Sequence, residues 1–249
     1  MMQSNNYILL FTGIMTIVLG GLLSFTSTYL QPLQKKQIDL DTKKKILATV
    51  TSLSDFQTPD EILNLYDQRF VSKVINLQGE EIKVDEEGNP LVAEEINIQK
   101  NYKLAPEKRK YPIFIYQNEK SEPESYIFPM FGNGLWDWIS VYVALSGDMN
   151  TILGVSFDHK AETPGLGARI ASSEVQDRFK AKKIFDETGQ LQSVRMLRGE
   201  KGLPLGPHEV DGMSGATLTG RGVTQMLKSY FSCYAAYILK KKRENKSVR

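Results

Sequence analysis

The sequence predicts an α+β fold, an antiparallel sheet flanked by helices, preceded by a single N-terminal transmembrane helix. Three observations support this prediction. An uncharged apolar segment runs from Tyr7 to Phe25. Strand-like alternation and turn residues recur between residues 70 and 197. Apolar residues at helical spacing close the chain from Val223 to Ile238.

The first apolar segment is long enough to cross a membrane. No charged side chain occurs before Lys35, and about 20 apolar residues at ~1.5 Å per residue span a hydrocarbon core of about 30 Å. A cleaved signal peptide would need a positively charged start and a small-residue cleavage site. The chain starts with MMQSNN, which is uncharged, and no clear cleavage pattern follows Phe25. We therefore expect residues 1–34 to be a retained membrane anchor.

The charges that follow the anchor leave its orientation open. Lys35, Lys36 and the lysines at 43–45 lie just after the apolar segment, and the positive-inside rule favours a cytoplasmic position for them. Asp39 and Asp41 lie among these lysines, however. Long domains also cross membranes largely regardless of nearby charge.

Composition narrows the classes of function. The formal net charge of +2 gives no reason to expect nucleic acid as a partner. Cys233 is the only cysteine, so this chain alone builds no disulfide, iron–sulfur cluster or cysteine-based zinc site. Residues 35–249 are numerous enough for a large domain with a hydrophobic core.

The elements of this domain follow from hydrophobic periodicity. Residues 35–65 have helical spacing with a helix start at Thr58, and residues 70–100 alternate between turns, as short antiparallel strands do. The closing helix presents one apolar face and ends in cationic residues 240–243, which favours a docked helix over a second membrane span. The remaining predicted elements are an apolar run at 111–117, strands at 139–145, 152–157 and 191–197, and a short helix at 173–179.

Three segments are rich in glycine, which lets backbone approach a ligand closely or adopt a positive φ. They are FGNGLWDW at 131–138, HKAETPGLGAR at 159–169 and DGMSGATLTGRG at 211–222. Each segment taken alone fits a tight turn. In the third, hydroxyl side chains directly precede the closing helix, whose N-terminus would bind an anion such as phosphate. The simpler alternative is that Thr217 or Thr219 caps the helix.

Other kinds of site fit the sequence less well. The segment Gly212–Ala216 lacks the last glycine of a nucleophile elbow, and no histidine follows His208 to complete a hydrolase triad. The GLG at 165–167 lacks the third glycine of a dinucleotide-binding loop. His159 has acidic neighbours, but a lone histidine at a strand end is more often hydrogen-bonded than a metal ligand. We therefore assign neither a catalytic group nor a metal site.

Together the three segments resemble the FMN-binding domain family, which includes the C subunit of the Na⁺-translocating NADH:quinone reductase and the related G subunit of the Rnf electron-transport complex. The segment from Asp211 to Thr217 is similar to the family's D-x-x-[ST]-G-A-T flavinylation motif. The resemblance covers about 130–230 in detail. The matching pieces are Gly134-Leu135-Trp136, Glu162-Thr163-Pro164-Gly165-Leu166-Gly167 and Asp211-x-x-Ser214-Gly215-Ala216-Thr217.

The resemblance implies a phosphodiester between FMN and the hydroxyl of Thr217, installed on the periplasmic side by a separate FAD-using, Mg²⁺-dependent flavin transferase. Residues 35–249 would then be an extracytoplasmic domain on the bacterial inner membrane, with the FMN-binding region at about 130–230. The isoalloxazine ring would stack near Trp136. The other expected cofactor-binding residues are Ser214, Gly215, Ala216 and Thr219 on the phosphate side, and Leu135, Glu162, Thr163, Gly165, Leu166 and Gly167 on the ring side.

By the same resemblance the chain is an electron carrier within a sodium-transporting oxidoreductase. It would accept electrons from an iron–sulfur centre and pass them to a neighbouring flavin subunit on the way to ubiquinone, while another subunit oxidises NADH. The segment of roughly 100 residues between the anchor and Gly134 favours the quinone reductase subunit over the Rnf subunit. A membrane-anchored binding protein without flavin is the alternative from a different class.

Overall fold

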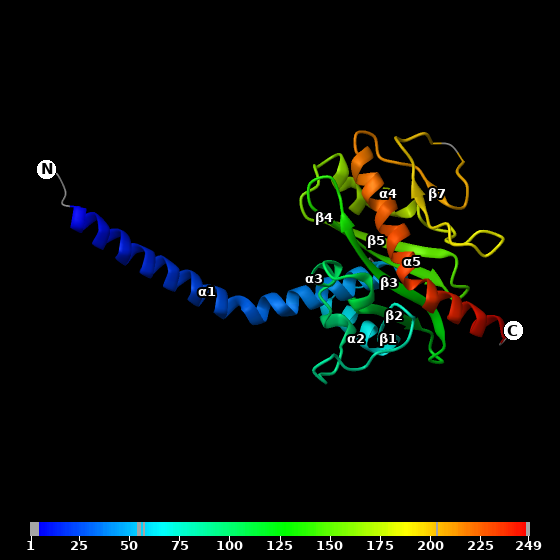
Figure 1. Cartoon of the computed structure of the whole chain (residues 1–249), viewed down its shortest axis with the longest axis horizontal. Coiled ribbons are helices and arrows are strands. Elements are labelled where there is room, and N and C mark those ends of the chain that lie inside the picture. Colours follow the sequence, from blue (N-terminus) through cyan, green and yellow to red (C-terminus); the bar gives the residue numbers. More distant parts are fainter. Residues whose placement is uncertain (1–4, 54–55, 57, 203, 248–249) are drawn as a thin grey trace. The chain divides into compact units, whose positions relative to one another are not determined.

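The chain divides into two compact units, Met1–Thr42 and Lys43–Arg249, in the computed structural model, which describes residues 5–53, 56, 58–202 and 204–247. Helix α1 (Asn5–Leu47) makes up most of the first unit and ends in the second (Figure 1). Its side chains are exposed from Asn5 to Asp39. Among the described residues it is the one helix long and apolar enough to cross a membrane. An apolar surface with no protein cover is what a membrane span requires.

The second unit is built on a five-stranded antiparallel sheet in which each strand pairs with the next along the chain. Ile139, Val141 and Val143 are buried at alternate positions, as their sequence pattern predicts. The predicted α+β fold is therefore confirmed. The strands are β1 (Phe70–Ile75), β2 (Tyr111–Gln117), β3 (Pro123–Asn133), β4 (Trp138–Ser146) and β5 (Ile152–His159).

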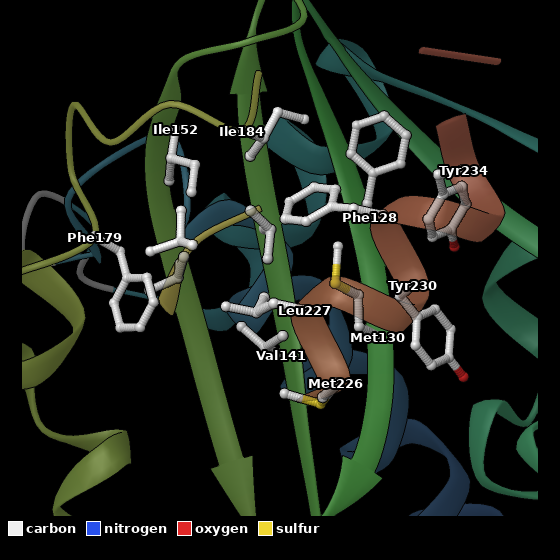
Figure 2. Packing of buried hydrophobic residues seen from close by; sticks show 14 of the residues in the cluster. Phe128, Met130, Val141, Ile152, Phe179, Ile184, Met226, Leu227, Tyr230 and Tyr234 are labelled. Carbon is white, nitrogen blue, oxygen red and sulfur yellow. The ribbon is translucent and has the colours of Figure 1, made fainter. Parts of the chain in front are cut away.

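Helix α5 (Thr217–Ser247) packs across this sheet, chiefly against β3. Figure 2 shows its side chains Met226, Leu227 and Tyr230 facing Met130 and its neighbours on the strands. At the same interface the hydroxyl of Tyr234 donates to the carbonyl oxygens of Pro112 and Pro129, at 2.9 and 3.2 Å. The amphipathic pattern from Val223 to Ile238 thus belongs to a helix whose apolar face is buried in the core.

Short elements complete the second unit. The first turn of α2 is capped by Thr58, whose hydroxyl accepts from the Glu61 N–H at 3.4 Å, as the sequence predicts. Strands β6 and β7 pair in parallel. The elements are α2 (Pro59–Arg69), η2 (Ala93–Glu95), α3 (Ile98–Tyr102), η3 (Pro106–Lys108), η4 (Gly167–Ala171), α4 (Ser173–Asp177), β6 (Arg195–Met196) and β7 (Glu209–Val210).

Two strand predictions are correct only in part. Of residues 70–100, only β1 is a strand, and the rest forms isolated bridges followed by η2 and α3. Of residues 191–197, only Arg195 and Met196 pair as a strand. The helix predicted over 35–65 is also interrupted, because α1 ends at Leu47 and α2 begins at Pro59. In each of these ranges the hydrophobic pattern extends over a few residues only, and tertiary packing determines where the strand or helix begins and ends.

Strand β3 is the long strand that the sequence pattern missed. Residues 125–132 are all buried, so the alternation that identifies a half-buried strand is absent. Pro129 also argues against a strand in the sequence. Strand β2 pairs with β3 only as far as Ile127, however, so the missing N–H of Pro129 breaks no bond to β2.

Candidate functional site

Three loops meet at the N-terminus of α5. Residues 134–137 join β3 to β4, residues 160–166 follow β5, and residues 211–216 lead into the helix. The sheet brings the first two loops together, because β4 pairs with both neighbours near this end, in the registers Asn133↔Trp138 and Ile139↔His159. The three glycine-rich segments of the sequence are therefore neighbours in space.

Glu162 ties these loops together. Its Oε1 accepts hydrogen bonds from the backbone N–H groups of Leu135 and Trp136, at 2.8 and 3.0 Å. Its Oε2 accepts a hydrogen bond from the Thr219 hydroxyl at 2.6 Å. The side chain is buried, with 4% of the residue exposed. Glu162 therefore lies beneath the surface and connects its own loop to the other two segments.

Two glycines make room for this carboxylate. A Cβ on Gly134 would lie 2.4 Å from Glu162 Oε1, and a Cβ on Gly167 would lie 2.3 Å from Glu162 Oε2 and 2.7 Å from Thr219 Oγ1. Real Cβ atoms do not approach oxygen so closely, so any side chain at either position would displace the carboxylate. Gly134 and Gly167 thus serve close packing within the protein.

We call residues 211–219 the attachment segment, after the flavin attachment that the sequence predicts there, and its two threonines differ in environment. Thr217 is the first residue of α5 and is partly exposed. Thr219 is 1% exposed, and its hydroxyl donates to Glu162. The hydroxyl of Thr219 therefore holds the loops together, contrary to the alternative in which it caps the helix, and Thr217 is the more exposed of the two residues.

The start of α5 offers unpaired backbone donors. Its first helical hydrogen bond in the described chain runs from the Gly220 N–H to the Ala216 carbonyl, at 3.0 Å. The amides of residues 217–219 precede that bond, so they have no helical acceptor. Gly215, with φ of +76°, turns the chain into the helix, and Leu166 packs over it, 2.7 Å from where a Cβ would lie. An anion beside Thr217 would meet these donors and the positive end of the helix dipole.

Apolar side chains are exposed around the attachment segment. Trp136 is 68% exposed, and its indole N–H donates to the Thr163 hydroxyl at 3.2 Å, which orients the ring. The sequence did not identify Leu218, which is exposed although it lies on a helix, because nothing local distinguishes it from a core residue. Exposed apolar side chains that gather near polar donors are typical of a binding surface. We call this set the apolar patch; it comprises Leu135, Trp136, Leu166 and Leu218.

Apart from Glu162, the charged residues described next bond to the loops around the site. Lys160 forms an ion pair with Asp137 at 2.9 Å, and its hydrogen bond lowers the pKa of that carboxyl. Asp211, the first residue of the attachment segment, accepts from the backbone N–H groups of Lys201 and Gly202, at 2.8 and 2.7 Å. The motif aspartate therefore anchors a neighbouring loop.

A second charged cluster lies behind Asp211. Arg178 donates to the Gly212 carbonyl and forms ion pairs with Glu174 and Glu200, at 2.6 and 2.9 Å. Arg169 pairs with the same two glutamates. Beside the cluster lies a cavity of about 470 Å³, lined largely by charged side chains. No local sequence pattern indicated this cluster, because its members lie on η4, α4 and a long loop.

Metal-binding groups are scarce in the described part of the chain. No set of three or more His, Cys, Asp or Glu side chains is placed there to hold a metal ion. His159 lies at the end of β5, where its Nδ1 is buried without a hydrogen-bond partner among the described residues. Cys233 is buried on α5.

Comparison with known proteins gives consistent matches. Residues 134–232 match the FMN-binding domain family, a range that includes all three loops. The chain is 33% identical over 226 residues to the C subunit of the Na(+)-translocating NADH-quinone reductase of Neisseria meningitidis serogroup A, covering 86% of this chain and 85% of that protein. It is 27% identical over 230 residues to the corresponding protein of Haemophilus ducreyi, covering 88% and 86%.

Solved structures agree with these matches. The crystal structure of the C subunit of the Na(+)-translocating NADH-quinone reductase from Parabacteroides distasonis superimposes with a TM-score of 0.71 and 30% identity. The superposition covers 84% of this chain and 96% of that one. The fold is also that of Shewanella oneidensis NqrC, with a TM-score of 0.71 and 23% identity, covering 84% and 99%.

Proposed function

Because this chain belongs to the NqrC family, the C subunits of the Na(+)-translocating NADH-quinone reductase, and is an FMN-carrying part of that oxidoreductase, we propose that its FMN is esterified through its phosphate to Thr217. The observation that carries the proposal is the contrast between two threonines. Thr217 is partly exposed, whereas Thr219 is buried and its hydroxyl is bonded to Glu162. Thr217 is therefore the more exposed of the two threonines, which supports it as the residue that an enzyme modifies.

The surroundings of Thr217 suit a phosphodiester. The unpaired amides and the dipole at the start of α5 would stabilise the charge that remains on an esterified phosphate. Ser214 and Gly215 are exposed just before the helix, and the positive φ of Gly215 turns the chain there. We assign the phosphate to this turn, with Ala216 as buried support beneath it.

The apolar patch suits the ring system. Trp136 offers an exposed aromatic face of fixed orientation, and Leu135 and Leu166 extend the apolar surface beside it. Thr163 holds the indole, and Gly165, with φ of +73° and open space around it, turns the loop there. When bound, FMN supplies the electron-accepting chemistry, and the chain's own residues position it and set its surroundings.

The role that follows is a relay between fixed partners. A cofactor tethered by an ester does not exchange with a soluble pool. We place this protein between an iron–sulfur centre and a neighbouring flavin subunit of the same complex, on the way to ubiquinone. The relatives named above are all C subunits of the quinone reductase, which supports this assignment over the Rnf subunit.

We further propose that α1 anchors the protein in the bacterial inner membrane and that residues 35–249 lie on the periplasmic side, where a flavin transferase would modify Thr217. The exposed apolar helix supports the anchor. A reporter fused after Arg249 should be active only outside the cytoplasm. Activity inside would show that the lysines after the apolar segment set the orientation.

Peptide mass spectrometry tests the attachment site. The full chain is co-expressed with a flavin transferase, and the peptide containing residues 217–219 is analysed. We expect an FMN-sized adduct on Thr217 in the wild type and in Thr219→Val, and none in Thr217→Ala. Thr217→Ser is the matched control, because it retains a hydroxyl at the same position. An adduct on Thr219, or on the Thr217→Ala protein, would refute the assignment.

A further inference from the structure

Glu162 is a buried carboxylate that no cation neutralises within the described residues. In the described part of the chain, the side-chain nitrogens of lysine, arginine and histidine lie more than 4.0 Å from the carboxylate oxygens of Glu162. The neighbouring Asp137, in contrast, forms an ion pair with Lys160 at 2.9 Å. Its compensation comes from three hydrogen-bond donors, namely the two backbone N–H groups and the Thr219 hydroxyl. The three donors meet both carboxylate oxygens, which act here only as hydrogen-bond acceptors.

The position of this charge relates it directly to the apolar patch. The two amides that Glu162 binds belong to Leu135 and Trp136, whose side chains are exposed in the patch. The Glu162 carboxylate is thus hydrogen-bonded directly to the backbone of the two residues whose side chains form this part of the patch. At 4% exposure it is shielded from solvent, so its field is screened far less than that of a surface carboxylate.

We infer that Glu162 acts as a positioning residue whose buried charge lowers the reduction potential of the flavin. This inference rests on the proposed attachment of FMN at Thr217 and a ring at the apolar patch. Reduction adds electrons to the ring system, and a fixed negative charge nearby disfavours that gain. The same side chain holds the 134–136 loop, so it sets both the place and the electrostatic surroundings of the ring.

Glu162→Gln separates the charge from the geometry. The amide oxygen of glutamine can accept from the Leu135 and Trp136 N–H groups, while its NH₂ group donates to the Thr219 hydroxyl. The side chain has the same size, so the contacts with Gly134 and Gly167 persist. The variant therefore removes the charge and retains the connections among the three loops.

Thr219→Val makes the opposite electrostatic change. The valine lacks the hydroxyl that donates to Glu162 Oε2, and the charge of Glu162 remains. Fewer hydrogen-bond donors then offset that charge. A charge-setting role predicts shifts of opposite sign in the two variants, whereas a role in loop positioning alone predicts shifts of the same sign. Asp137→Asn is the matched control for loss of a paired, partly exposed carboxylate in the same loop.

The experiment is a spectroelectrochemical titration of the full-length flavinylated protein in detergent. We expect Glu162→Gln to raise the midpoint potential, Thr219→Val to lower it by less, and Asp137→Asn to raise it less than Glu162→Gln. An unchanged or lower potential in Glu162→Gln would overturn the inference. If that variant does not fold, Thr219→Val decides, because an unchanged or higher potential there would also overturn it. Absence of flavin on wild-type Thr217 would instead refute the proposed function.

Discussion

The two sides of the candidate site are built by different means. The attachment segment, residues 211–219, presents hydroxyls and unpaired amides because it ends at the start of a helix. In the apolar patch, the backbone of Leu135 and Trp136 is held by Glu162, a buried residue on another loop. A helix end is a local feature, whereas the patch depends on contacts between distant segments. Changes on the first side should therefore act on attachment, and changes on the second on the bound ring.

The largest expected effect is on the attachment side. Thr217→Ala should abolish covalent flavin while the domain still folds, because one partly exposed hydroxyl contributes only about 1 kcal/mol. In-gel flavin fluorescence after denaturation measures attachment, and circular dichroism measures folding. If Thr217→Ala failed to fold, the threonine would be structural and the contrast between the two sides would be lost.

A glycine beneath the patch should give the next largest effect. Gly167→Ala would drive a Cβ into Glu162 and Thr219, so we expect the free energy of unfolding to fall by about 1–3 kcal/mol. Urea denaturation provides the measurement. Gly206→Ala is the control, because a Cβ there meets no atom within 4 Å and should change stability by less than about 0.5 kcal/mol. Equal stability of the two variants would mean that the carboxylate moves freely.

Substitutions in the patch itself should leave flavin attached and change its spectrum. Trp136→Ala removes an exposed aromatic face and Leu166→Ala an apolar contact, so we expect a shifted flavin absorption band with roughly wild-type attachment. Leu153→Ala, an exposed leucine on β5, should leave the band unchanged. Wild-type spectra in both patch variants would place the ring elsewhere.

The smallest effect concerns the charged cluster behind the attachment segment. Hydrogen bonds from Arg169 and then Arg178 lower the pKa of Glu200 from 4.5 to about 2. Because the folded value is the lower one, these interactions stabilise the fold above pH 4.5 and the stabilisation is lost as pH falls toward 2. Glu200→Gln should therefore weaken the acid dependence of the urea midpoint in that window. The change should be small because solvent screens these charges.

Part of this protein is determined by local sequence. The uncharged apolar run specifies the exposed helix α1, and the alternation at 139–145 specifies β4. The apolar spacing from Val223 onward specifies the buried face of α5. Each pattern depends on neighbours within a few residues along the chain, so a single sequence reveals it. The motif from which we propose Thr217 as the attachment site is equally local.

Tertiary structure decided the rest. Thr217 and Thr219 are two positions apart and chemically identical, yet the first is partly exposed and the second is buried and bonded to Glu162, 57 residues away in sequence. The burial of Glu162 and the exposure of Leu218 likewise depend on how loops from β3, β5 and α5 meet. Strand β3 escaped detection because both of its faces are covered. Burial is a property of the packed molecule, and local periodicity reports it only where one face of an element meets solvent.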